Sequence, residues 1–142
     1  MGEPIGDLRV RFTQLKGTQI GGALIPRLVD ELPVLAVAAA CAEGETIIQD
    51  AAELRVKESD RIAATAAGLI VNGIDVAETP DGMIIQGGRL QGGRVASAGD
   101  HRIAMAFSIA ALAGGASRID DVANVQTSFP NFRQLLTEVC DA

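Results

Sequence analysis

Three segments of the chain share one pattern of hydrophobic and polar positions. Each opens with a residue type that caps helices, continues through a nearly unbroken apolar run, and reaches a glycine fourteen positions later. The segments begin at Asp30, Ser59 and Asp100 and end at Gly44, Gly73 and Gly114. The pattern predicts three helices of equal length, each capped by its first residue and stopped by its glycine.

Short stretches rich in β-branched residues follow each predicted helix, at residues 46–48, 74–76 and 117–122. Residues 83–86 and 94–96 supply further strands between the second and third helices, and 14–20 is a candidate ahead of the first. Residues 7–12 alternate between apolar and charged side chains, which predicts a half-buried strand. A unit of helix, turn and strand therefore repeats, and the fold class is α/β or α+β.

A last helix is expected at the C-terminal end. Residues 129–139 are predicted to form it, with Ser128 as its cap and Pro130 near its start.

The predicted helices are apolar on nearly every face, which is typical of helices buried on all sides. We therefore expect them to pack together in the middle with strands outside, the reverse of an ordinary barrel. If they run the same way, their N-termini meet on one rim. That rim would carry Asp30, Glu31, Lys57, Glu58, Asp60, Arg61, Asp100, His101 and Arg102.

Residues 54–61, LRVKESDR, place three cations where an apolar helix begins. The positive end of the helix dipole makes this unfavourable by roughly 0.3–1 kcal/mol unless an anion compensates, so the segment predicts a ligand. Lys57, Arg61 and Arg102 beside three helix N-termini suit phosphate and carboxylate groups. Asp30 and Glu58 are candidates for proton transfer.

Simpler interpretations stay open for these residues. The charges of residues 54–61 are equally consistent with a surface salt-bridge cluster worth ~0–1 kcal/mol per pair. Asp30 and Ser59 are also explained as helix caps, and for Asp100 this interpretation is preferred. His101, the only histidine, is a candidate catalytic base, but it has no metal-binding partner and no serine motif beside it, so an orienting or structural role is preferred. The glycines at 87, 88, 92 and 93 match no phosphate-loop motif and are turn residues.

Composition excludes several classes of protein. The 142 residues form one domain or a piece of a larger protein, and a net charge of -6 without Trp or Tyr argues against nucleic-acid binding. Cys41 and Cys140 do not indicate a disulfide framework. No apolar run approaches the ~20 residues that span a bilayer and no signal sequence opens the chain, so we expect a soluble, cytoplasmic protein.

Four motifs, in chain order, carry a resemblance to a known family. They are DELPVLAVAAACAEG, LRVKESDRIAA, GDHRIAMAFSIAALA and TSFPNF, and together they resemble the 5-enolpyruvylshikimate-3-phosphate synthases. The resemblance implies an enolpyruvate transferase-like fold with two domains, each an inside-out α/β barrel of repeated units around parallel buried helices. Residues 1–142 would then be a single, partial domain, most of the C-terminal one, with the N-terminal domain absent.

The resemblance also implies an activity and a set of roles. Such enzymes, the targets of glyphosate, transfer the enolpyruvyl group of phosphoenolpyruvate to the 5-hydroxyl of shikimate 3-phosphate in aromatic amino-acid biosynthesis, without a metal or cofactor. Asp30 would bind shikimate 3-phosphate and take the hydroxyl proton, and Glu58 would move a proton to and from phosphoenolpyruvate. Lys57 would reach the reacting oxygens and shikimate 3-phosphate, while Arg61 and Arg102 would grip phosphoenolpyruvate.

Some positions depart from the family pattern. Thr127 stands where some members have a lysine against phosphoenolpyruvate, and Glu53 where some have an asparagine. The first-domain cations that complete the site have no counterpart, so the isolated chain is expected to be inactive without its N-terminal part. The alternatives are a non-catalytic fragment that binds phosphate or phosphoenolpyruvate weakly, or an enzyme acting on UDP-N-acetylglucosamine, against which KESDR and GDHR weigh.

Overall fold

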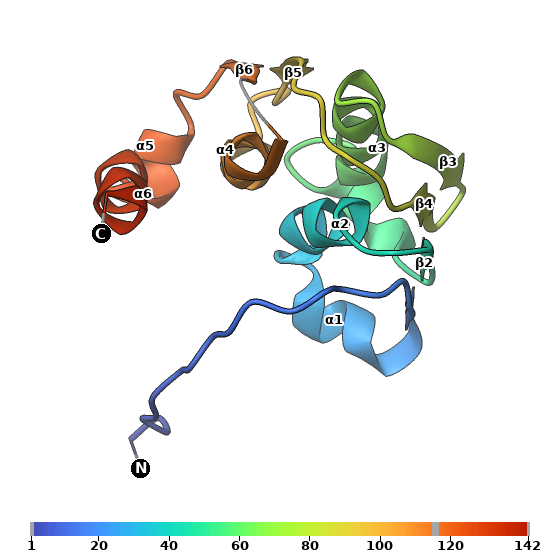
Figure 1. The fold of residues 1–142 in the computed structure, drawn as a ribbon, viewed down its shortest axis with the longest axis horizontal. Coiled ribbons are helices and arrows are strands. Elements are labelled where there is room, and N and C mark those ends of the chain that lie inside the picture. The colour runs from blue at the N-terminus through green and yellow to red at the C-terminus, as the bar shows by residue number, and fades with distance from the viewer. Residues whose placement is uncertain (1, 115–116, 142) are drawn as a thin grey trace.

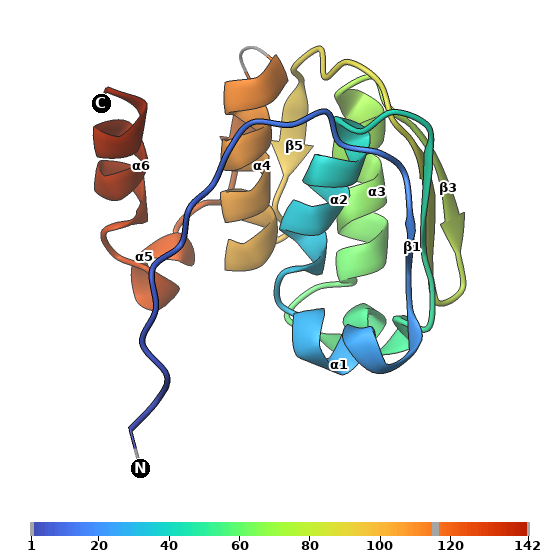
Figure 2. The same cartoon turned by 60° about the horizontal axis from the view of Figure 1, so that its bottom comes forward.

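Three parallel helices form the centre of the molecule. The computed structural model describes residues 2–114 and 117–141. Helices α2 (Leu32–Ala40), α3 (Arg61–Val71) and α4 (His101–Gly114) pack against one another, and Figure 2 shows their axes nearly aligned. All three predicted helices are confirmed, but α2 ends four residues before Gly44 and is the shortest of them.

The starts of α3 and α4 are capped by aspartates. Asp60 accepts the backbone N–H of Ala63 at 3.0 Å, so the prediction of Ser59 as the cap of α3 is wrong by one residue. Asp100 accepts the N–H of Arg102 at 2.8 Å, which confirms its predicted capping role. Each such cap satisfies one orphan N–H and stabilises its helix by about 1 kcal/mol.

Helix α3 ends where the sequence places its glycine. Gly73 has a φ of +83° and its N–H donates to the carbonyl of Ile70, while Ile74 donates to Leu69. This pair of hydrogen bonds is a Schellman motif, which needs a left-handed residue at the Gly73 position. The predicted stop is therefore confirmed together with its physical cause.

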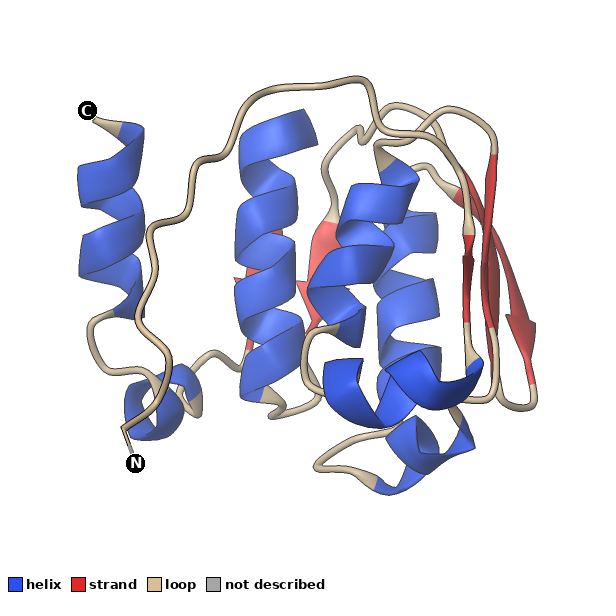
Figure 3. Cartoon of the chain, turned by 90° about the horizontal axis from the view of Figure 1, so that it is seen from below, coloured by secondary structure: helices blue, strands red, loops and turns tan. Residues whose placement is uncertain are grey.

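Two sheets lie outside the helices, as Figures 1 and 3 show. The larger has the order β1-β2-β4-β3; β2 pairs parallel with β1 and antiparallel with β4, and the smaller is a parallel β5–β6 pair. The strands are β1 (Gln19–Ile20), β2 (Glu45–Ile48), β3 (Asp75–Thr79), β4 (Gly82–Gln86), β5 (Arg94–Ala96) and β6 (Arg118–Asp120). The prediction of helices inside and strands outside is confirmed.

The core lies where α3 and α4 approach each other and the sheets. Phe107 of α4 is fully buried, and a Cβ built at Gly68 of α3 would lie 2.2 Å from its ring. Only glycine permits this approach. The helices are nevertheless not buried on every side, because Ile70 and Leu112 keep 53% and 58% of their surface exposed. The expectation of burial on all faces is wrong at those outer positions.

The strand predicted at residues 7–12 does not form. Leu8 and Phe12 are both 97% exposed, and Figure 1 shows this stretch as an extended trace leaving the body of the protein. Alternation alone does not make a strand, which needs a hydrogen-bonded neighbour, and no residue that the structure describes pairs with this segment. The second candidate, 14–20, contributes only β1 and a bridge from Lys16 to Glu43.

The remaining helical segments are short. They are the 3-10 turns η1 (Gly22–Leu24) and η2 (Ala52–Val56) and the helices α1 (Ile25–Leu28), α5 (Val125–Ser128) and α6 (Phe132–Cys140). The predicted C-terminal helix therefore begins three residues later than expected, behind Asn131, and Ser128 ends α5 instead of capping α6. Among the described residues, no helix has the length and apolarity needed to cross a membrane.

Candidate active site

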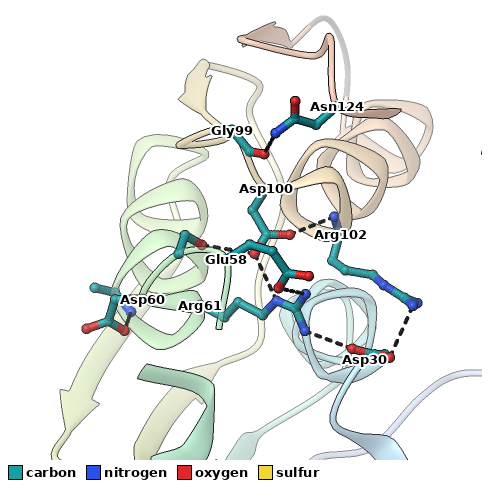
Figure 4. A network of polar contacts seen from close by, with 10 residues as sticks. Asp30, Glu58, Asp60, Arg61, Gly99, Asp100, Arg102 and Asn124 are labelled. Carbon is teal, nitrogen blue, oxygen red and sulfur yellow. Dashed lines mark hydrogen bonds and ion pairs between the residues drawn. The ribbon is translucent and has the colours of Figure 1, made fainter. Parts of the chain in front are cut away.

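The starts of the three central helices meet around the guanidinium of Arg61, the first residue of α3 (Figure 4). Its Nε donates to Asp100 at 2.9 Å, its Nη1 to Asp30 at 2.9 Å and its Nη2 to Glu58 at 2.6 Å. Asp30, Glu58 and Asp100 stand shortly before α2, α3 and α4 respectively. One side chain thus joins three helix starts, and the predicted convergence is confirmed.

Arg61 is a buried charge. Its side chain is 1% exposed and that of Asp100 is 0% exposed. A charge removed from water costs several kcal/mol unless it is paired and hydrogen-bonded, and the start of a helix adds to the cost of a cation. The sequence predicts an external anion for this reason, but the chain supplies the anions itself, as three carboxylates.

Asp100 is much more than a helix cap. Besides Arg61 and the N–H of Arg102, it accepts the hydroxyl of Ser59 at 3.0 Å. Burial by itself raises the pKa of Asp100, but the hydrogen bonds from Arg61, Arg102 and Ser59 outweigh it, and the pKa lies below the ordinary aspartate value. Sequence reasoning missed this anchor because its main partner lies 39 residues away.

Asp30 links Arg61 to a second arginine. Arg102 Nη2 donates to Asp30 at 3.1 Å. The predicted capping role of Asp30 is wrong, because Glu31 occupies the N-cap position of α2 and makes no side-chain cap. The hydrogen bond from Arg61, followed by the charges of Arg102, Arg61 and Lys57, holds the pKa of Asp30 below its usual value although partial burial opposes the shift.

The solvent side of the cluster carries accessible charges of both signs. The side chains of Asp30 and Glu58 are 43% and 52% exposed, and that of Arg102 is 33% exposed. Lys57 is exposed and forms no ion pair with any residue the structure describes, yet its charge acts on Asp30. Cations that can bind an anion therefore lie next to carboxylates that a substrate can reach.

Arg55 and Asp60 belong to a different arrangement. Arg55 Nη1 donates to Asp60 at 2.8 Å, and its Nη2 donates to Glu78 at 2.8 Å and to the carbonyl of Thr79 at 2.6 Å. These bonds hold η2 against the turn between β3 and β4. For Arg55 and Asp60 the salt-bridge interpretation of residues 54–61 is correct, whereas Glu58 and Arg61 lie in the central cluster.

The other predicted rim residues have no polar partner at the cluster. His101 begins α4, and neither it nor Glu31 has a side-chain hydrogen bond within the described part of the chain. Thr127, which the sequence resemblance matched to a lysine of some family members, donates its hydroxyl to the carbonyl of Asn124 at 2.7 Å. Glu53 is exposed in η2.

A cavity of about 240 Å³ opens beside Asp30 and Arg102. Its other walls are largely apolar and come from Glu31, Val34, Met105, Ala106, Ile109, Phe129 and Phe132. The buried Nε of Arg102 has no hydrogen-bond acceptor among the described residues. Within residues 2–114 and 117–141 no three His, Cys, Asp or Glu side chains are placed to hold a metal ion.

The arrangement defines a class of site. Three helix N-termini, two arginines and a lysine can bind phosphate or carboxylate groups, because orphan N–H groups and guanidinium forks both donate to anions. Two accessible carboxylates, Asp30 and Glu58, are hydrogen-bonded to the arginines and can take or give protons. This is an anion-binding site with acid–base groups at its edge.

Comparison with known proteins gives the family. The model of the family described as EPSP synthase (3-phosphoshikimate 1-carboxyvinyltransferase) matches residues 2–136. Proteins named 3-phosphoshikimate 1-carboxyvinyltransferase from Xanthomonas oryzae pv. oryzae and from Methylococcus capsulatus are each 58% identical over 135 residues, 94% of this chain. The chain belongs to the EPSP synthase family.

Solved structures agree in fold. The EPSP synthase of Acinetobacter baumannii superposes with a TM-score of 0.84 at 46% identity, over 88% of this chain and 30% of that one. A second structure of EPSP synthase from the same organism gives a TM-score of 0.81 at 42% identity. The α/β fold is thus that of the family, while the chain spans about a third of the length of its curated relatives, 31% in the Xanthomonas and Methylococcus proteins.

Proposed function

We propose that this chain is part of an enzyme that transfers the enolpyruvyl group of phosphoenolpyruvate to the 5-hydroxyl of shikimate 3-phosphate and releases phosphate. Its relatives carry the name of that transferase. The observation that carries the proposal is the Arg61 cluster, in which Asp30, Glu58 and Arg102 come from three helix starts. A cytoplasmic location belongs to the same proposal.

The two accessible carboxylates carry the protons. Glu58 delivers a proton to the methylene carbon of phosphoenolpyruvate, which makes the neighbouring carbon electrophilic. The 5-hydroxyl oxygen attacks that carbon while Asp30 accepts its proton, and a tetrahedral intermediate forms. Glu58 then takes a proton back from the methyl group, the bond to the phosphate oxygen breaks, and inorganic phosphate leaves with the electron pair.

The cations hold the substrates and stabilise the leaving phosphate. Arg102 is partly exposed beside the cavity, and with Arg61 it grips phosphoenolpyruvate. Lys57 is exposed and reaches both the reacting oxygens and shikimate 3-phosphate. Because the side chain of Arg61 is 1% exposed, direct contact with phosphoenolpyruvate requires that one of the three carboxylates around it move aside.

The site on this chain is one wall of the proposed active site. The chain corresponds to about a third of its relatives. We propose that it forms most of the C-terminal domain of a two-domain enzyme, that the remaining substrate contacts come from the N-terminal domain, and that the chain alone is inactive. Weak binding of phosphate or phosphoenolpyruvate is then the most that it retains.

A phosphate-release assay with both substrates tests this proposal. The chain is assayed alone and after fusion to the part of the Xanthomonas oryzae relative that it does not cover, hereafter the fused enzyme. We expect turnover by the fused enzyme that depends on shikimate 3-phosphate, and none by the chain alone. Turnover by the chain alone would show that the missing wall is dispensable, and a folded but inactive fused enzyme would reject the function.

A further inference from the structure

The three carboxylates that bind Arg61 differ in burial and in the number of hydrogen bonds that each accepts. Asp100 is 0% exposed and accepts from Arg61, from Ser59 and from the N–H of Arg102. Asp30 is 43% exposed and accepts from Arg61 and Arg102. Glu58 is 52% exposed, and within the described structure Arg61 is its single partner. Glu58 is therefore the least restrained of the three.

These carboxylates take three of the five N–H groups of Arg61, and its side chain is 1% exposed, so an anion can reach the guanidinium only where one carboxylate moves aside. Displacing Asp100 would leave a buried carboxylate short of its main charge partner, which is the costliest outcome. Displacing Asp30 would disturb two arginines at once. Displacing Glu58 needs only the rotation of a half-exposed side chain into water, where hydration compensates for the lost bond.

Building on the proposed function, we propose that phosphoenolpyruvate binds by exchange: one of its anionic groups takes Nη2 of Arg61 from Glu58, and the arrival of the substrate thereby releases the acid that acts on it. While it accepts from Nη2 of Arg61, the carboxylate of Glu58 faces the guanidinium and not the substrate. Glu58 is thus held inactive until phosphoenolpyruvate is present. Asp30 and Asp100 keep the guanidinium in place during the exchange.

The groups that face Glu58 set the limits of this exchange. Arg61 is its partner, Asp30 and Asp100 share that guanidinium, and Lys57 precedes it in the chain. Glu58 therefore competes with phosphoenolpyruvate for a cation. Removing its carboxylate should tighten substrate binding even though it abolishes proton transfer, and this combination is the signature of the exchange.

Calorimetry tests the exchange. It measures the affinity of the fused enzyme for phosphoenolpyruvate in the absence of shikimate 3-phosphate. Three variants are compared: Glu58→Gln, Glu58→Asp, and the matched control Glu31→Gln, which removes a charge from the same rim but no bond to Arg61. We expect Kd to fall about threefold to tenfold in Glu58→Gln, as for one charge-assisted hydrogen bond at a half-exposed position. It should change less than about twofold in Glu31→Gln.

Glu58→Asp separates the lost bond from the lost charge. Its carboxylate keeps the charge but is one methylene shorter, so binding should again be tighter than in the wild type. Unchanged or weaker binding in both Glu58 variants would overturn the exchange while leaving the proposed function intact, provided that the wild-type fused enzyme turns over. Tighter binding in a fused enzyme that never turns over would instead support the exchange and reject the proposed function.

Discussion

Arg55 and Arg61 lie in one eight-residue segment, residues 54–61, but differ in burial and in what their side chains connect. Both donate to acidic side chains at 2.6–2.9 Å, and both side chains are well supplied with acceptors. Arg55 is 26% exposed and connects η2 to the turn after β3, whereas Arg61 is 1% exposed and connects the starts of three helices. The number of ion pairs does not distinguish a structural brace from a site.

The distinguishing features are burial and convergence. The partners of Arg55 are a helix cap and groups at the end of a surface strand. If one of these partners is removed, water can hydrogen-bond to Arg55 in its place. Two of the three partners of Arg61, Asp30 and Asp100, lie 31 and 39 residues away, and water cannot replace the buried Asp100. A cation with such partners both fixes the helix starts and positions the carboxylates that a substrate can reach.

The largest predicted effect is on the free energy of unfolding, and it should differ between the two aspartates that cap α3 and α4. Asp100→Ala leaves the buried Arg61 short of a carboxylate and should lower the free energy of unfolding by about 3–5 kcal/mol. Asp60→Ala removes a cap and a half-exposed partner of Arg55 and should lower it by about 1 kcal/mol. Urea denaturation of the 142-residue chain measures both, and equal losses would remove the contrast between the two clusters.

A somewhat smaller effect should fall on substrate binding. Arg102 extends the Arg61 cluster through Asp30 to the cavity that both residues line. In the fused enzyme, Arg102→Ala should weaken phosphoenolpyruvate binding about tenfold to a hundredfold, as for the loss of a charge-assisted anion contact, and shikimate 3-phosphate binding much less. Titration of each substrate separately gives the two affinities, and equal losses would contradict the assigned role.

The smallest effect concerns pH. The pKa values of Asp100 and Asp60 both lie below the ordinary value of about 3.9, so each carboxylate stabilises the folded protein above roughly pH 5 and loses this contribution as the pH falls through its folded pKa. Because Asp100 is buried and Asp60 is not, Asp100→Asn should flatten the acid side of the stability curve more than Asp60→Asn. Unfolding free energies between about pH 3 and 6 provide the comparison.

Much of the fold follows from local pattern. The apolar runs gave the three central helices, and the β-rich stretches gave β2, β3, β4, β5 and β6, because both signals lie within a few residues of the chain. Residues 7–12 carry an equally clear alternation without forming a strand, since pairing depends on a neighbour that a local pattern does not contain. The start of α6 was misplaced for a similar reason, as α5 takes the residues assigned to its cap.

The sequence predicts which residues belong to the candidate site, but not which of them are hydrogen-bonded to one another. A repeat of capped helices brings Asp30, Arg61 and Arg102 to one rim, and the structure places them in one cluster. The sequence does not reveal that Arg61 is buried and bonded to three carboxylates, nor that Asp100 is its anchor, because such pairs depend on packing between distant segments. The difference between Asp60 and Ser59 as caps rests on one hydrogen bond, from Ala63.

The most direct test of the account is the turnover of the fused enzyme carrying Arg61→Lys or Arg55→Lys. Lysine keeps the positive charge but cannot present three donors in a fixed fork, so Arg61→Lys should release Asp30 and Glu58 from their positions. We predict that kcat/KM falls at least about a hundredfold in Arg61→Lys and less than about twofold in Arg55→Lys, with both proteins folded. Equal values of kcat/KM in the two variants would contradict the claim that the Arg61 cluster, and not the motif as a whole, is the site.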